Sequence, residues 1–489
     1  MVRGPSRPGC ARGRLPGVPS QRPVPDFAAV RAEFALPDAF PPAVLAEATQ
    51  AAAERPGPGP GRRDATDVEL VTIDPPGSKD LDQAVGVVRR GAGFRVHYAI
   101  ADLGAVVVPG GALDTDVRRR GQTIYLPDGA VPLHPPVLSE DAASLLPDGP
   151  RAAVLWTVDL DGDGEVVAVD VGRALVRSRA RLDYAGVQAD IAAGSLHPGI
   201  AGLPELGPLR RAHAVRRGAI ELELPEQEVV PDGAGGWTVQ VRRRLDVESW
   251  NAEISLLTGM AAARIMLDAG VGLLRTLPAP DDDALAAFRR AARELGFAWP
   301  EGASVAEVLA GLPADTPSAL ALRRAATTLL RGAGYAAFDR AAGAPPPDDP
   351  GHGGIGAPYA HVTAPLRRLI DRFGTEVCLA VVAGQELPEW LRTALPALPE
   401  AMAASDALAG RVDRACVDRT EAALLHTHVG REFDAVVLRP GQADGEAGEV
   451  YVPEPPVLAR CTGDLAAGAV VRVRLQEADP ATGRIEFAA

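Results

Sequence analysis

The hydrophobic pattern of this 489-residue chain changes its period twice, and these changes limit the folds that the chain can adopt. From about 66 to 181, short apolar runs such as "VELVTID" and "FRVHYAIADL" predict β-strands separated by turns. From about 183 to 430, apolar residues recur at spacings of three and four, which indicates helices. Strand-like runs return at 431–489. We therefore predict an α+β protein whose last strands form a small five-stranded barrel.

The N-terminal part has a different composition from the rest of the chain. Residues 1–25 are rich in Pro, Gly and Arg, which predicts a disordered basic tail. A helix is expected at 41–54, and the breaker "RPGPGPGRR" follows it. We divide the chain into this tail, a helical lead-in and linker at 26–65, a main domain at 66–430 and a β-segment at 431–489.

The composition excludes several classes of protein. The chain is 47% hydrophobic, but it has no run of eighteen or more apolar residues, so we expect no membrane span. A net charge of −14 argues against general coating of nucleic acid, although it permits a local basic channel. The four cysteines fit neither a zinc site nor a disulfide framework, and we expect reduced thiols in a cytoplasmic protein: Cys10, Cys378, Cys416 and Cys461.

The stretch "TIDPPGSKDLDQAV" at 72–85 places Asp74, Asp80 and Asp82 within nine positions. If its second half is extended, Asp80 and Asp82 share one face while Leu81 points into the core. Carboxylates that converge repel each other unless cations lie between them, and magnesium is the cation that prefers oxygen ligands. Two such ions about 4 Å apart activate water and stabilise the leaving oxygen of a phosphodiester. The alternative is a surface turn with solvated acids.

The segments around these acids resemble the catalytic (RNB) domain of the ribonuclease II and ribonuclease R family. That family carries a "T-I-D" strand followed six residues later by "D-x-D-D-A", and "TIDPPGSKDLDQA" matches it except at the last aspartate. Further blocks follow in the family's order, over roughly 66–385: "YAIADL", "RRGQTIYLPDGAVPLHPPVLSEDAASLLP", "RLDYAGVQADI" and "YAHVTAPLRRLIDRF".

The resemblance implies a fold and an activity. The expected fold is an antiparallel sheet region with helices around an RNA channel, followed by an S1-like barrel. The expected activity is magnesium-dependent 3′–5′ hydrolysis of single-stranded RNA to 5′-mononucleotides in RNA turnover, with manganese as a possible substitute. A channel that admits one strand would let an acidic protein bind RNA through a few arginines. We expect a monomer, with RNA as its partner.

The resemblance also assigns roles to individual residues. Metal binding is predicted for Asp74, Asp80, Asp82 and Gln83, and a catalytic role for Asp82, Arg367 and Arg368. RNA binding is predicted for Tyr125, Tyr184, Glu253 and Arg367, the two tyrosines by stacking on bases. For an isolated tyrosine the alternative is core packing, and for Arg367 it is a helix-surface position.

Gln83 departs from the family pattern, because it stands where the fourth aspartate is expected. An amide keeps an oxygen but removes a negative charge, so metal affinity or turnover should fall. The alternative function is an RNB-fold RNA-binding protein with weakened or lost catalysis. A carboxylate-pair glycosidase is a third hypothesis, but no sugar-stacking aromatics lie near the acids.

The segment "DLDGDGEVVAVD" at 159–170 has acids at the positions of a calcium-binding EF-hand loop. An EF-hand needs a helix on each side, whereas strand-like runs flank this segment. We therefore predict a β-hairpin there.

Overall fold

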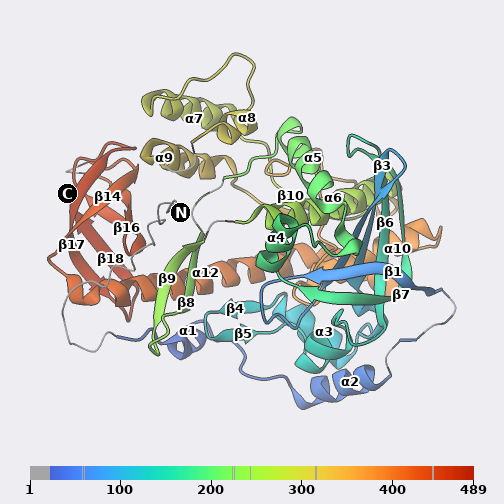
Figure 1. The fold of residues 1–489 in the computed structure, drawn as a ribbon. Helices are drawn as coiled ribbons and strands as arrows, with labels where there is room; N and C mark the ends of the chain where they lie inside the picture. The colour runs from blue at the N-terminus through green and yellow to red at the C-terminus, as the bar shows by residue number, and fades with distance from the viewer. Residues whose placement is uncertain are drawn as a thin grey trace, which may run out of the picture.

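The computed structural model describes the chain from residue 23 to 489, apart from residues 55, 58, 60, 223, 225, 243, 314, 315, 443 and 444. Most of the predicted tail at 1–25, together with Cys10, therefore lies outside the described residues. Two bodies rich in β-structure stand at opposite ends of the molecule, and a long helix, α12 (Leu398–Leu425), runs between them (Figure 1). The predicted order of strand-rich, helical and strand-rich segments is confirmed.

The N-terminal β-body is a closed barrel, whose strands lie in the order β1, β2, β3, β6, β7. A parallel pairing of β1 with β7 closes the barrel, and the other neighbours run antiparallel, so the predicted antiparallel sheet curls onto itself. Closure leaves no open sheet edge. The strands are β1 (Arg63–Ile73), β2 (Gln83–Arg90), β3 (Gly93–Ala101), β6 (Arg151–Leu160) and β7 (Val166–Leu182).

The turn between β6 and β7 is the segment that resembles a calcium loop. Strands flank it on both sides, so the predicted hairpin is confirmed. Asp161, at the start of the turn, accepts hydrogen bonds from the backbone N–H groups of Asp163 and Glu165, at 3.0 and 2.8 Å. These bonds tighten the turn, because an aspartate side chain caps backbone groups two to four residues ahead of it.

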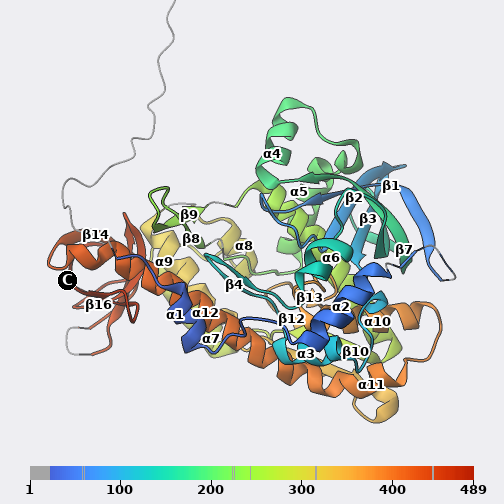
Figure 2. The ribbon, with the colours of Figure 1, turned by 90° about the horizontal axis from the view of Figure 1, so that it is seen from below.

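Helices cover the barrel and extend from it to the C-terminal body (Figures 1 and 2). The helix predicted at 41–54 is α2, and its proline at the first position fits the preset φ of a helix start. The helices are α1 (Phe27–Glu33), α2 (Pro42–Ala53), α3 (Ala112–Arg120), α4 (Tyr184–Ala193), α5 (Leu203–Arg216), α6 (Asp246–Ala269), α7 (Asp282–Glu294), α8 (Val305–Ala310), α9 (Pro317–Ala326), α10 (Leu369–Val382), α11 (Glu389–Ala394) and α12 (Leu398–Leu425). Among them, none combines the length and the apolar character that a membrane span requires.

Short hairpins interrupt the helical region, where the hydrophobic pattern predicts mainly helices. The hairpin β8–β9 reaches toward the C-terminal body beside α12 (Figure 1). Within the described chain the paired strands are β4 (Ile124–Leu126) with β5 (Gly129–Val131), β8 (Glu226–Pro231) with β9 (Trp237–Arg242), β10 (Val271–Thr276) with β11 (Gly334–Asp339), and β12 (Gly351–His352) with β13 (Ala357–Pro358).

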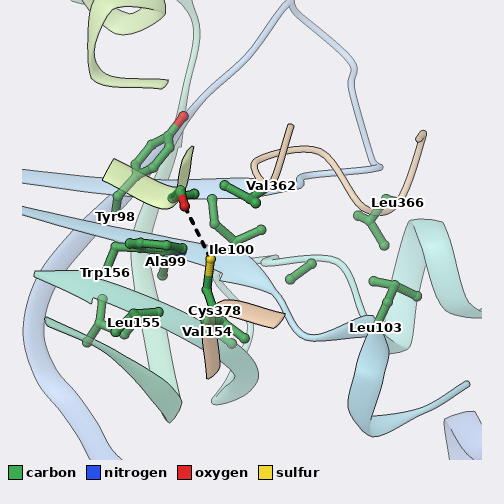
Figure 3. Packing of buried hydrophobic residues seen from close by; sticks show 14 of the residues in the cluster. Tyr98, Ala99, Ile100, Leu103, Val154, Leu155, Trp156, Val362, Leu366 and Cys378 are labelled. Carbon is green, nitrogen blue, oxygen red and sulfur yellow. Dashed lines mark hydrogen bonds between the residues drawn. The ribbon is translucent and has the colours of Figure 1, made fainter. Parts of the chain in front are cut away.

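The barrel core continues into the segment that leads to α10. Figure 3 shows Val362 and Leu366 of this segment in one apolar cluster with Ile100 of β3 and Cys378 of α10. Cys378 is fully buried, and its thiol lies 3.9 Å from the carbonyl oxygen of Ala262 in α6. Burying a valine or leucine side chain such as Val362 or Leu366 contributes about 1.5–3 kcal/mol. The core therefore holds residues 362–366 firmly against the barrel.

The C-terminal body is a second closed barrel, in the order β14, β15, β16, β18, β17, and the predicted five-stranded barrel is confirmed. It packs on α9 and on the end of α12. Arg324 of α9 makes two hydrogen bonds to the Glu449 carboxylate, at 2.6 and 2.7 Å. The strands are β14 (Glu432–Arg439), β15 (Gly448–Pro453), β16 (Pro456–Thr462), β17 (Val470–Asp479) and β18 (Arg484–Ala488).

A buried glutamate joins this barrel to α12 and to the hairpin β8–β9. Glu421 is 1% exposed, and its Oε1 accepts hydrogen bonds from the Leu458 N–H and the Gln227 side-chain amide. Burial raises the pKa of Glu421 to about 8, against the two hydrogen bonds, which favour the charged form. The contact between these three elements is therefore sensitive to pH.

We expect Glu421→Gln to remove this sensitivity. Between about pH 4.5 and pH 8 the folded protein keeps a proton that the unfolded chain releases, so wild-type stability falls as the pH rises through this window. A raised pKa of this size corresponds to a loss of about 5 kcal/mol by high pH. Glutamine keeps the accepting oxygen and stays neutral. Thermal unfolding should show the advantage in Tm of the variant growing from pH 5 to pH 9; a constant difference would contradict this.

Candidate active site

The acid-bearing loop, residues 74–82, connects β1 to β2. Pro-Pro-Gly at 75–77 ends β1, because proline lacks the N–H that a strand ladder uses and Gly77 takes a φ of 90°. Leu81 is fully buried, and its N–H donates to Ser144 Oγ at 3.0 Å. Leu81 thus fixes the loop to the core and orients the aspartates on either side of it.

The structure corrects the predicted strand through Asp80 and Asp82. Both residues lie in the loop, because β2 begins only at Gln83. Leu81 points into the core as expected, but its two neighbours differ in exposure. Asp82 is 3% exposed, whereas Asp80 is only partly buried.

Asp82 is the most buried of the three acids. Its Oδ1 accepts a hydrogen bond from the Leu366 N–H at 2.7 Å. Its Oδ2 has no hydrogen-bond partner among the described residues and lies 3.7 Å from Nε of Arg367. Burial raises the pKa of Asp82 to about 8, although Arg367 and the Leu366 hydrogen bond both act to lower it. The hydrogen bond and the arginine therefore do not offset the cost of burying the charged carboxylate, whose Oδ2 has no hydrogen-bond partner among the described residues.

Asp80 interacts electrostatically with both Asp74 and Asp82. The Asp74 N–H donates to the Leu182 carbonyl at 3.1 Å, which extends the pairing of β1 with β7 by one residue. Burial, and to a smaller extent Asp80, raises the pKa of Asp74 to about 6, while Arg367 opposes the shift. Asp80 also contributes to the raised pKa of Asp82. The loop thus gathers the three predicted acids into one electrostatic neighbourhood.

These acids fit a divalent cation by their chemistry, although the described chain contains no cluster of three or more His, Cys, Asp or Glu side chains already arranged around one point. Oδ2 of Asp82 is buried without a partner, and burial disfavours the charged forms of Asp74 and Asp82. A cation among them would favour the charged forms again. Magnesium takes carboxylate oxygens together with waters. Asp74, Asp80 and Asp82 are the residues that would hold it.

Gln83 is engaged at both ends of its side chain. Its Nε2 donates to the Thr363 carbonyl at 2.5 Å, and its Oε1 accepts from the Tyr98 hydroxyl at 3.0 Å. The amide thus ties β2 and β3 to the segment that leads to Arg367. This arrangement does not favour the predicted role of Gln83 as a metal ligand, because its oxygen already serves a hydrogen bond within the protein.

We expect Gln83→Asp to have opposite effects with and without metal. Aspartate cannot donate to the Thr363 carbonyl, and leaving a buried acceptor unpaired costs about 1–3 kcal/mol. The same aspartate adds a fourth acid beside Asp82. In EDTA, thermal unfolding should give the variant a lower Tm than wild type. Adding magnesium should raise the Tm of the variant by more than it raises the Tm of wild type. An unchanged Tm in EDTA would show that the Thr363 contact contributes little.

The two arginines of "TAPLRR" have different environments. Arg367 is 46% exposed and faces Asp82, whose charge raises the pKa of the guanidinium against the lowering effect of burial. Arg368 forms a two-pronged ion pair with Asp371, which is fully buried. The Asp371 carboxylate also accepts from the Ala364 N–H at 2.7 Å. The geometry therefore favours a direct role for Arg367 over one for Arg368, whose guanidinium is occupied in holding the loop; the catalytic role of Arg368 stays a prediction.

Tyr125 of the β4–β5 hairpin projects beside the acids. Its ring is 52% exposed, and its hydroxyl donates to Asp80 Oδ2 at 3.2 Å. A cavity of about 360 Å³ opens here, lined by Tyr125, by both arginines and by Ala409, Gly410 and Asp413 of α12. An exposed ring at the edge of a cavity can stack on a base, as predicted for this residue.

Tyr184 and Glu253 were both predicted to contact RNA, and the structure separates them. Tyr184 begins α4, and burial together with Asp74 raises its pKa, so it lies near the acids. Glu253 of α6 is 7% exposed and pairs at 3.3 Å with Arg217, the C-cap residue of α5. Its carboxylate is engaged with this arginine, and its contact with RNA stays a prediction.

The sequence analysis missed two residues of α6 that lie close to the site. Asn251 Nδ2 lies 3.5 Å from the Tyr184 hydroxyl, and Ser255 Oγ lies 2.9 Å from Thr363 Oγ1. Residues four apart share one face of a helix, whereas a residue midway between them points elsewhere. The polar pair at spacing four was the signal for these residues, and the position of Glu253 between them explains its different orientation.

Comparison with known proteins assigns both bodies. The family model for the RNB domain matches residues 62–375, from the start of the first barrel into α10. The model for the RNase II-type exonuclease C-terminal S1 domain matches residues 431–489, the second barrel. The first match alone spans more than half of the chain. The chain therefore belongs to the RNB-domain family, and its second barrel is an S1 domain of the RNase II type.

Relatives include enzymes and at least one protein described as inactive. Ribonuclease R of Escherichia coli K12 is 32% identical over 328 residues, which cover 64% of this chain and 39% of that protein. An inactive exonuclease of Arabidopsis thaliana is 29% identical over 357 residues, 67% of this chain and 34% of that protein. The chain thus spans well under half the length of these two curated relatives. Apo Mycoplasma genitalium RNase R shares the fold, with a TM-score of 0.82 and 21% identity. The match covers 94% of this chain and 77% of that one.

Proposed function

We propose that this protein is a magnesium-dependent 3′–5′ exoribonuclease that acts as a monomer in RNA turnover, hydrolysing single-stranded RNA to 5′-mononucleotides. The observation that carries the proposal is Oδ2 of Asp82, buried without a partner within the described chain and 3.7 Å from Nε of the half-exposed Arg367. A buried carboxylate facing an accessible guanidinium suits the joint binding of a cation and a phosphate.

In this proposal the acids hold the metal and Arg367 holds the phosphate. Magnesium, when bound, supplies an activated water and neutralises charge on the phosphate, and manganese can replace it. Asp82 is held by the Leu366 N–H, so its free oxygen keeps a fixed direction. The next residue, Arg367, is fixed by the same contact. Its fork donates to phosphate oxygens, whose charge increases in the transition state.

Single-stranded RNA is the substrate that best fits the surroundings of the acids. Tyr125 offers an exposed ring at the cavity, and Tyr184 lies near Asp74 on the α4 side. Stacking on such rings contributes roughly 1–3 kcal/mol per base and accepts any sequence. Mycoplasma genitalium RNase R was solved in complex with ribose-methylated single-stranded RNA, and with double-stranded RNA. We propose that this protein also binds single-stranded RNA.

A second candidate is an RNA-binding protein of the same family without catalysis. Gln83 favours it, because both ends of the amide serve the protein and the fourth acid is missing. The three remaining acids and Arg367 favour the enzyme, since RNA binding alone does not require a buried, uncompensated Asp82.

The deciding experiment uses 5′-labelled single-stranded RNA with magnesium, with manganese and with EDTA. An exoribonuclease gives products shortened progressively from the 3′ end with either metal, and none in EDTA. RNA that is bound but stays intact with both metals would overturn the proposal in favour of the second candidate. Activity that appears only in Gln83→Asp would identify the missing acid as the cause.

A further inference from the structure

A second cavity, of about 570 Å³, lies away from the acids, between α5, α6 and the β6–β7 hairpin. Figure 1 shows these elements at the side of the molecule opposite the C-terminal barrel. Its apolar lining comes mainly from α6, through Leu257, Met260, Ala261 and Ile265. Its charged lining comes mainly from α5 and includes a buried arginine, Arg210.

Arg210 of α5 is a buried cation without an ion-pair partner in the described structure. It is 4% exposed, and it makes one hydrogen bond, from Nη1 to the Gly164 carbonyl at 2.8 Å. Its Nε is buried and unpartnered within the same described chain. A buried charge needs a counter-charge, because moving an unpaired ion out of water is costly. Burial accordingly lowers the pKa of Arg210.

The carboxylates near Arg210 are engaged with other residues. Glu253 pairs with Arg217 at 3.3 Å, and Glu165 pairs with His213 at 2.8 Å. Arg217 also has a buried Nη1 without a hydrogen-bond partner among the described residues. Two guanidinium groups on the same wall therefore have N–H donors left over, and both residues line the cavity.

The charge balance of the lining points the same way. The lining holds four arginines, Arg210, Arg216, Arg217 and Arg264, and the carboxylates of Glu165 and Asp268. Arg264 pairs with Asp268 at 2.8 Å and Arg217 with Glu253 at 3.3 Å, so Arg210 and Arg216 are the two arginines of the lining without an ion pair among the described residues. This positive excess stands out in a chain whose net charge is −14. An anion would remove the imbalance, and the apolar wall of α6 would receive an apolar group attached to it.

We propose that this cavity binds a small molecule with one oxyanion, a phosphate or a carboxylate, on an apolar body. The oxyanion accepts from Arg210 and Arg217, while the apolar body lies along Leu257 and Ile265. Arginine suits both headgroups, because its fork matches the two oxygens of either. The site does not depend on the proposed nuclease activity, since its residues lie on the face of α6 that is turned away from Asn251 and Ser255.

Calorimetry on the full chain tests this site with four probes: n-octyl phosphate, octanoate, inorganic phosphate and the neutral octyl glucoside. We expect n-octyl phosphate and octanoate to bind and octyl glucoside not to bind. Whichever of the two anionic amphiphiles binds more tightly identifies the preferred headgroup. Arg210→Met, which keeps the volume and removes the charge, should weaken binding roughly tenfold or more, the value of a charge-assisted hydrogen bond. Arg290→Gln, which changes the net charge equally at an exposed position on α7, should leave it unchanged.

Two further results keep the test decisive. Arg210→Met should change the Tm little without ligand, because removing an uncompensated charge offsets the lost hydrogen bond to the Gly164 carbonyl. If it fails to fold, Arg216→Gln at the exposed edge should still weaken binding. Failure of both amphiphiles to bind at millimolar concentration would overturn the proposal. So would an Arg210→Met protein that loses affinity for single-stranded RNA while no probe binds the wild type, since the cavity would then belong to the RNA path.

Discussion

Asp82→Asn is expected to abolish RNA cleavage while leaving the protein at least as stable as wild type. Asparagine keeps Oδ1 as the acceptor for the Leu366 N–H but removes the charge that Asp82 Oδ2 carries without a partner in the described chain. Loss of a carboxylate that we propose binds the metal should lower kcat/KM by roughly a thousandfold or more, the scale of losing preorganised charge stabilisation. Because burial already raises the pKa of Asp82 to about 8, the neutral side chain suits its surroundings.

The comparison variant for this experiment is Asp413→Asn. Asp413 lines the same cavity on α12 and is exposed, so its substitution changes the charge equally without touching the acid loop. Cleavage of labelled RNA and thermal unfolding should be measured on all three proteins. A Tm for Asp82→Asn several degrees below wild type would mean that the carboxylate stabilises the fold, contrary to the role we assign to it.

Arg367→Gln is expected to lower kcat/KM by about a hundredfold to a thousandfold, with little change in Tm. The guanidinium is 46% exposed, and its ion pair with Asp82 is long, at 3.7 Å, so removing it should cost little stability. Arg367→Lys should recover part of the activity, because it restores the charge but not the fork.

Arg368→Gln should behave in the opposite way. It leaves the fully buried Asp371 without its cation, and breaking such a pair costs about 3–5 kcal/mol. The two neighbouring arginines thus give a matched pair, one expected to lose turnover and the other stability. Equal losses of stability in both variants would refute this division of roles.

Much of the fold follows from local patterns. Apolar runs predict most strands of the two barrels, although β2 and β18 were not among them, and the Asp-Gly turn at 161–164 predicts the β6–β7 hairpin. The hairpin β8–β9 was missed, although a glycine-rich turn separates its two valine-containing runs, because it lies in a region dominated by helical spacing. Closure of the first barrel by β1 and β7 joins strands about a hundred residues apart, which no local pattern specifies.

The site divides in the same way. The order of motifs leads to Asp74, Asp80, Asp82 and Arg367, and the structure places them in one electrostatic neighbourhood. It also reveals what Gln83 does: the amide contacts Thr363, 280 positions away, so its role depends on tertiary structure alone. The pairing of Arg368 with Asp371 lies within three residues, but only their burial shows that the pair is structural.

The most direct test of the central claim is mass spectrometry of the products released from single-stranded RNA in ¹⁸O-labelled water with magnesium. Hydrolysis at the site of Asp82 and Arg367 predicts 5′-mononucleotides that carry one ¹⁸O on the phosphate, from wild type and not from Asp82→Asn. Products that end in 3′-phosphate or cyclic phosphate, or no released nucleotide at all, would contradict it.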